Sequence, residues 1–76
     1  MSHQDLPLAS GKRHQKTFEK LGWVVRRAGE HIVMTHPQND CILSIPNHKE
    51  VKRATLQSIL RNIGITTKQY RTMFDA

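Results

Sequence analysis

Three short β-prone segments stand between two helical patterns, and this order constrains the fold more than any other feature of the sequence. The segments are rich in β-branched and aromatic residues, which favour strands. We expect strands over residues 23–27, 31–36 and 41–45. The breaks between them are short: Gly29–Glu30, where glycine would supply a positive φ, and a loop over Pro37–Asp40. Such connections join antiparallel neighbours, so the sequence predicts a three-stranded meander.

A first helix is expected before the sheet. Ser10 is suited to cap its start, and Gly22 is suited to end it, because glycine readily takes the left-handed conformation. Residues at helical spacing form its inner face, which is only partly apolar: His14, Thr17, Phe18 and Leu21.

A second helix after the sheet has the clearest pattern in the chain. Gly64 ends it, and Thr66 and Gln69 then have the spacing of a capping box that opens a short third helix with Tyr70 and Phe74. The second helix is defined by an apolar stripe of Leu56, Ile59, Leu60 and Ile63.

These elements predict an α+β fold in the order α-β-β-β-α with an extra short C-terminal helix. Both main helices must bury their apolar faces on one small sheet, so they are expected on the same sheet face. The other face stays open. Residues 1–9 show no periodicity and are expected to form a flexible arm, with a single domain over 10–76.

The charge of the chain points to a polyanionic partner. Its 76 residues include 12 Lys and Arg against 6 Asp and Glu, a formal net charge of +6.

No apolar run approaches the roughly 20 residues of a membrane span, and the first residues lack the apolar core of a secretory signal. The single cysteine, Cys41, allows no internal disulfide. We therefore expect a cytoplasmic protein that acts without a membrane.

The predicted order is similar to the double-stranded-RNA-binding domain, and several short stretches resemble the HicA family of toxin–antitoxin toxins across nearly the whole chain. They are Ser10–Lys12, Leu21–Trp23, Gly29–His31, Ile45–His48, Thr55–Arg61 and Gly64–Ile65. The resemblance implies an mRNA interferase that acts independently of the ribosome. It also implies a HicB-type antitoxin as partner and mRNA as substrate.

The resemblance further implies that the histidine of a Gly-x-His hairpin is catalytic. That histidine is His31, and Gly29 makes the turn that positions it. Where the family usually has serine between them, this chain has Glu30. A carboxylate there either weakens phosphate binding or assists proton transfer, and the sequence leaves both readings open.

RNA supplies its own nucleophile for such a reaction. A ribose 2′-OH attacks the adjacent phosphorus, so the protein needs a proton-transfer group and positive charge. A histidine can give or take a proton near neutral pH. No cofactor is required, and no metal site is expected: His31 and His36 would lie on opposite strand faces, and Cys41 has no Cys-x-x-Cys partner.

A basic run provides candidate RNA contacts. Lys49, Lys52 and Arg53 lie at the predicted start of the second helix, where helix N–H groups also attract phosphate. They form either a phosphate clamp or an ordinary solvated charge run. Arg26 and Arg27 are expected on opposite strand faces, so one of them would flank His31.

The remaining candidates have less defined roles. His48 would protonate the leaving group, contact phosphate or fix its loop through the backbone. Trp23 and Tyr70 are expected in the core rather than stacked on bases. No function is expected for His3, His14 or His36. Two alternatives to a nuclease stay open: a non-catalytic RNA-binding module, and a domain that binds an acidic protein.

Overall fold

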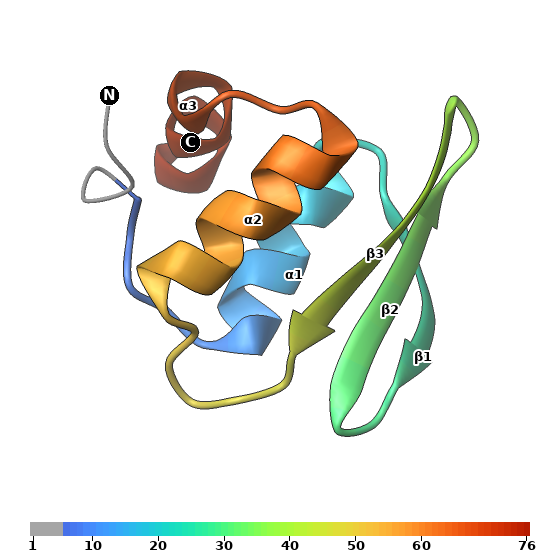
Figure 1. The fold of residues 1–76 in the computed structure, drawn as a ribbon, viewed down its shortest axis with the longest axis horizontal. Coiled ribbons are helices and arrows are strands. Elements are labelled where there is room, and N and C mark those ends of the chain that lie inside the picture. Colours follow the sequence, from blue (N-terminus) through green and yellow to red (C-terminus); the bar gives the residue numbers. More distant parts are fainter. Residues whose placement is uncertain (1–5) are drawn as a thin grey trace.

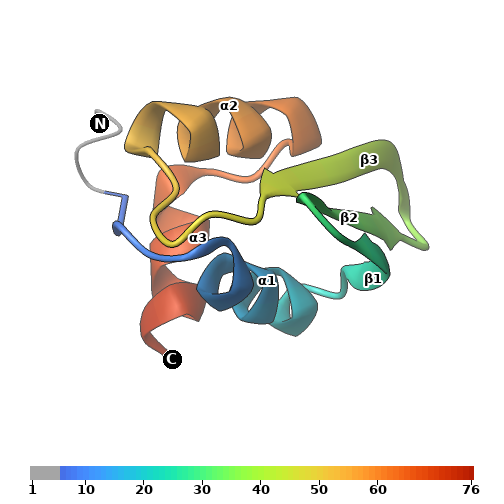
Figure 2. The same ribbon diagram turned by 90° about the horizontal axis from the view of Figure 1, so that it is seen from below.

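The computed structural model describes residues 6–76, and it has the predicted α+β architecture (Figure 1). The elements in chain order are α1 (Gly11–Lys20), β1 (Val24–Ala28), β2 (His31–His36), β3 (Asn39–Pro46), α2 (Arg53–Ile63) and α3 (Thr67–Asp75). The strands form an antiparallel sheet in the order β1-β2-β3. The helices lie on one side of the sheet and leave its other face uncovered, as Figure 1 and Figure 2 show.

The core lies between the helices and the inner sheet face. Alternate strand residues point inward, and helix side chains meet them. The fully buried residues include Ile32 and Met34 of β2, Leu43 and Ile45 of β3, Phe18 of α1, and Leu56 and Leu60 of α2. Trp23 and Tyr70 are also buried, which confirms that both belong to the core. The outer face therefore carries the odd-numbered residues of β2, beginning with His31.

The predicted helix ends are confirmed. The Ser10 hydroxyl accepts a hydrogen bond from the backbone N–H of Arg13 at 3.1 Å. Gly64 ends α2 with a φ of 81°, in the left-handed region. The side chains and backbone of Thr66 and Gln69 bond reciprocally, which completes the capping box of α3.

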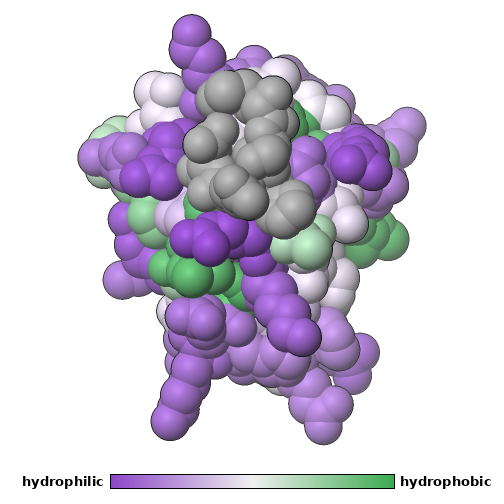
Figure 3. Space-filling view, turned by 60° about the vertical axis from the view of Figure 1, so that its left-hand side comes forward, coloured by the Kyte–Doolittle hydropathy of each residue, from purple (hydrophilic) through white to green (hydrophobic). Residues whose placement is uncertain are grey.

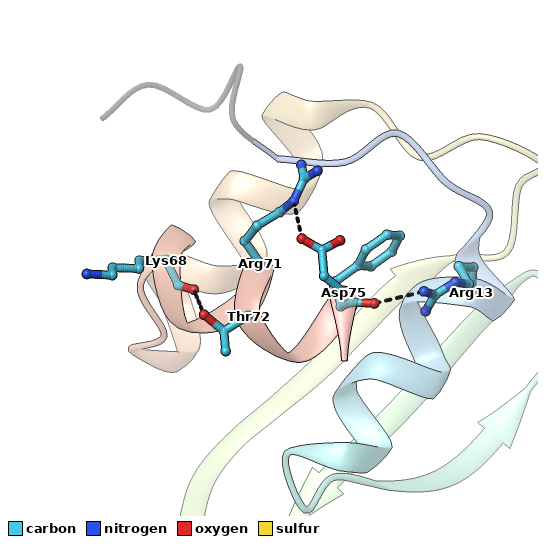
Figure 4. A network of polar contacts seen from close by, with 6 residues as sticks. Arg13, Lys68, Arg71, Thr72 and Asp75 are labelled. Carbon is cyan, nitrogen blue, oxygen red and sulfur yellow. Dashed lines mark hydrogen bonds and ion pairs between the residues drawn. The ribbon is translucent and has the colours of Figure 1, made fainter.

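α3 packs against α1, and its C-terminal end is held by cations of that helix. Arg13 Nη2 donates to the Phe74 carbonyl at 2.9 Å, as Figure 4 shows, and its guanidinium lies 3.9 Å from the centre of the Phe74 ring. Lys20 Nζ donates to the carbonyls of Met73 and Ala76. Cations at a helix C-terminus satisfy free carbonyls and complement the helix dipole. Two basic residues of α1 are thus used to dock α3.

The N-terminal segment is packed on the domain in the part that the structure describes. Leu6 is buried, and its carbonyl accepts a hydrogen bond from Arg53 Nε at 2.8 Å. Ala9 pairs with Val51 in an isolated β-bridge. Residues 6–9 are therefore fixed at several points, in contrast to the flexible arm expected there. Residues 1–5 of that arm, including His3, lie outside the described residues.

Candidate active site at the first hairpin

His31 begins β2 and faces the open side of the sheet. Its neighbours Ile32 and Met34 point into the core, so His31 and Val33 point away from it. A hollow of about 540 Å³ lies on this face, lined by Arg27, Gly29, Glu30, His31, Val33 and Ser44. The candidate catalytic histidine is therefore exposed in an open depression, where a polymeric substrate can reach it.

Arg27 shares this hollow because β1 contains a bulge. Val25 pairs with Met34, but the next paired residue is Arg27, opposite Val33, so Arg26 is an extra residue. The bulge shifts the inward–outward alternation by one position. Arg27 therefore lies on the same outer face as Val33 and His31.

The expectation that the two arginines lie on opposite faces is wrong for the same reason. Arg26 Nε donates to the Thr35 hydroxyl at 2.8 Å, and Thr35 pairs with the exposed Val24. Both arginines thus reach the open face, and Arg27 is the one that lines the hollow with His31.

The turn before His31 is held by hydrogen bonds from Asn47, and not by a left-handed backbone conformation at Gly29. The backbone N–H of Asn47 donates to the Glu30 carbonyl at 3.0 Å, and Asn47 Nδ2 donates to the Gly29 carbonyl at 2.9 Å. The positive φ expected at Gly29 is not observed: among the described glycines, only Gly22 and Gly64 have one. Asn47 was missed as a positioning residue, although the predicted pairing of β2 with β3 would have brought it to this turn.

The basic run follows β3, whose last residue, Pro46, pairs with His31. The run and the hairpin therefore lie at the same end of the sheet. Lys49 and Lys52 are exposed, and Lys52 precedes α2 without a side-chain cap. Arg53 is half-buried and bonded to the Leu6 carbonyl. Two of the three predicted clamp residues thus remain open to a ligand.

His48 lies in the same loop with an exposed side chain. Its backbone carbonyl accepts a hydrogen bond from the Gly11 N–H at 2.9 Å, which joins the loop to the start of α1. Its side chain does not line the hollow. The structure brings Arg27, Gly29 and His31 together in the hollow, and His48, Lys49 and Lys52 lie outside it, in the segment between β3 and α2.

Two other histidines have structural partners. His14 is completely buried, and its Nδ1 shares a 2.6 Å hydrogen bond with the Tyr70 hydroxyl. Burial, followed by the positive charge of Arg13, lowers the pKa of His14 to about 4. Burial likewise raises the pKa of the Tyr70 hydroxyl. His36 accepts from the Gln38 N–H through Nδ1 and contacts the Leu21 carbonyl through Nε2. His14 and His36, for which no function was expected, have a structural role instead, because each joins separate elements.

Within residues 6–76, no three His, Cys, Asp or Glu side chains gather into a group that could hold a metal ion. No helix in this part of the chain has the length and apolar character needed to cross a membrane.

Comparison with known proteins gives a result that covers most of the chain. No curated protein sequence matches the chain significantly. The family model for the HicA toxin of bacterial toxin–antitoxin systems matches residues 11–65, from the start of α1 to the residue after Gly64. That match includes the hairpin with His31, the basic run and α2. The chain therefore belongs to the HicA toxin family and is the toxin of a toxin–antitoxin system, with an antitoxin as its partner.

Proposed function

We propose that this toxin is an endoribonuclease that cleaves mRNA without a metal ion and so inhibits translation. The observation that carries the proposal is the shared hollow of His31 and Arg27 on the open sheet face, at the end of the sheet where β3 leads into the basic run. His31 acts as the proton-transfer group. We place the reaction in the cytoplasm, and we propose a HicB-type protein as the antitoxin.

The hollow offers what cleavage by a ribose 2′-OH requires. Attack on phosphorus builds up negative charge on the phosphoryl oxygens, and a nearby guanidinium stabilises that charge. Arg27 supplies the guanidinium, and His31 supplies an imidazole beside it. Within residues 6–76 neither side chain makes a hydrogen bond or an ion pair, so both are available to substrate.

We assign substrate binding to the exposed cations of the basic run between β3 and α2. Lys49 and Lys52 precede a helix start that has no acidic residue in its first turn and no side-chain cap. Free N–H groups and the helix dipole add to the attraction for phosphate there. Figure 3 shows that hydrophilic side chains cover most of the side that includes the start of α2. This surface suits a solvated polyanion.

Cleavage of single-stranded mRNA by the purified protein in EDTA tests the proposal. The wild type is expected to cut, and His31→Ala is expected to bind RNA with unchanged affinity while cutting at least about 100-fold more slowly. Because His31 is exposed and its side chain makes no hydrogen bond or ion pair within residues 6–76, the variant should keep the wild-type thermal unfolding midpoint. Growth arrest on expression should likewise require His31.

Equal cleavage by the wild type and His31→Ala would rule out His31 as the proton-transfer group. RNA binding by the wild type without any cleavage would instead identify a non-catalytic RNA-binding module.

A further inference from the structure

We propose that Glu30 is the second proton-transfer group of this site, the base that accepts the proton of the 2′-OH while His31 protonates the leaving 5′-oxygen. This inference rests on the proposed nuclease function. It adds a general base to the general acid that His31 supplies. Two groups are needed because one imidazole cannot give and take a proton in the same step.

The geometry places the two groups side by side on a fixed turn. Glu30 and His31 are consecutive, both are exposed, and both line the hollow that Arg27 enters from β1. The backbone of this turn is held by the two hydrogen bonds from Asn47. A base on the turn, an acid on β2 and a cation on β1 therefore line one depression.

Glu30 has no structural role that would explain its position. Within residues 6–76 its carboxylate makes no hydrogen bond and forms no ion pair, not even with Arg27 in the same hollow. Glu30 is also the one acidic side chain among the residues that line it. A carboxylate at this place opposes phosphate binding in a chain whose net charge is +6. A role in proton transfer would explain why a carboxylate stands at a position where it weakens the binding of RNA phosphate.

The step balances without any further reactant. The 2′-OH proton passes to the Glu30 carboxylate, and the 2′-oxygen forms a bond to phosphorus. The bond from phosphorus to the 5′-oxygen breaks, and the protonated imidazole of His31 gives its proton to that oxygen. Arg27 faces the charge on the phosphoryl oxygens. The products are a 2′,3′-cyclic phosphate and a 5′-hydroxyl, and solvent resets the two protonation states.

The test compares Glu30→Gln with Glu19→Gln in single-turnover cleavage. Glu19 is exposed on α1, near the end of the sheet opposite the hairpin, so its substitution makes the same charge change away from the hollow. Glu30→Gln is expected to lower the cleavage rate by about 100-fold or more, the usual contribution of a general base. Its RNA affinity should stay the same or rise, because a negative charge is lost. Glu19→Gln should match the wild type.

A second substrate separates the two roles. RNA with sulfur in place of the 5′-oxygen at the cleavage site has a thiolate leaving group, which departs without a proton far more readily than an alkoxide. With this substrate His31→Ala should recover most of the wild-type rate, whereas Glu30→Gln should remain slow.

The outcomes distinguish the two proposals. Wild-type cleavage with an equally active Glu30→Gln would overturn the role of Glu30 and leave the nuclease intact. Rescue of Glu30→Gln but not of His31→Ala by the sulfur substrate would overturn the assignment of base and acid. Failure of the wild type to cleave either RNA would overturn the proposed function itself.

Discussion

His14 Nδ1 and the Tyr70 hydroxyl lie 2.6 Å apart in the interior, and neither side chain is exposed to solvent. The contact joins α1 to α3, and the ring of Phe74 lies 5.8 Å from the His14 ring. Residues 11–65 match the HicA family model, so α3 lies beyond the matched segment. A buried polar pair thus attaches the C-terminal helix to the domain that carries the candidate active site.

Tyr70→Phe should lower the free energy of unfolding by about 1–3 kcal/mol, because it leaves the buried His14 Nδ1 without a partner. His14 Nε2 already has no hydrogen-bond partner among the described residues, so the ring would lose its remaining polar contact. Urea unfolding at neutral pH measures the change. Thr72→Val is the control, since it removes an exposed hydroxyl from the same helix. Equal stability of Tyr70→Phe and the wild type would mean that the pair contributes nothing.

The stability of the protein should fall as the pH drops from about 6.5 to about 4. The pKa of His14 is lowered from 6.5 to about 4 in the folded protein, so in this range the unfolded chain binds a proton that the folded chain excludes. A pKa depression of this size corresponds to about 3 kcal/mol in the free energy of unfolding. This part of the stability is fully present above pH 6.5 and is lost as the pH falls to about 4.

Urea unfolding at several pH values in this range checks the sign and the size of that fall. His14→Gln should lose most of the pH dependence while keeping the background from the other titrating groups. A variant that keeps the full dependence would show that His14 is not its source.

Local patterns predicted the helices, their ends and the strand that begins with His31. Leu56, Leu60 and Ile63 are buried as their helical spacing indicates, and the φ of 81° at Gly64 ends α2 as expected. These features depend on residues close together in the chain. His31 was found through the family resemblance, and the face on which its side chain lies follows from the burial of the neighbouring Ile32.

Features that depend on distant parts of the chain were not predicted. The residue type at position 26 does not indicate the bulge, because the bulge arises from how β1 pairs with β2. Leu6 lies in a segment without periodicity, and its carbonyl is bound by Arg53, which is 47 residues away in sequence. His14 was interpreted as incidental because its partner, Tyr70, is far away in sequence.

Gly22→Ala should destabilise the fold, whereas Gly29→Ala should not. Gly22 has a φ of +96°, and a Cβ there would come within 2.7 Å of His36 Nε2, the atom that contacts the Leu21 carbonyl. The left-handed conformation alone costs about 1–2 kcal/mol for a residue with a side chain. Gly29 has open space around it. Thermal unfolding of the two variants gives the comparison, and a larger loss for Gly29→Ala would contradict the open, unstrained turn at Gly29.

Lys49→Ala combined with Lys52→Ala should flatten the salt dependence of RNA binding. Each lost phosphate contact reduces the slope of log affinity against log salt by about 0.7 for single-stranded nucleic acid, so two should reduce it by about 1.4. Lys68→Ala is the matched control, because Lys68 lies on α3 beside Trp23 and His36, at the other end of β2 from the hairpin. Binding titrations of an uncleaved RNA at several salt concentrations measure the slope.

Arg53 is left unchanged in that experiment because it has a second role. Its Nε holds the Leu6 carbonyl, so Arg53→Ala should also lower stability, and a loss of RNA affinity could not be assigned to phosphate contact alone. Lys49 and Lys52 are exposed, and their removal should leave the unfolding midpoint unchanged. An unaltered salt slope in the double variant, with a reduced slope in Lys68→Ala, would place the RNA backbone across α3 instead of the start of α2.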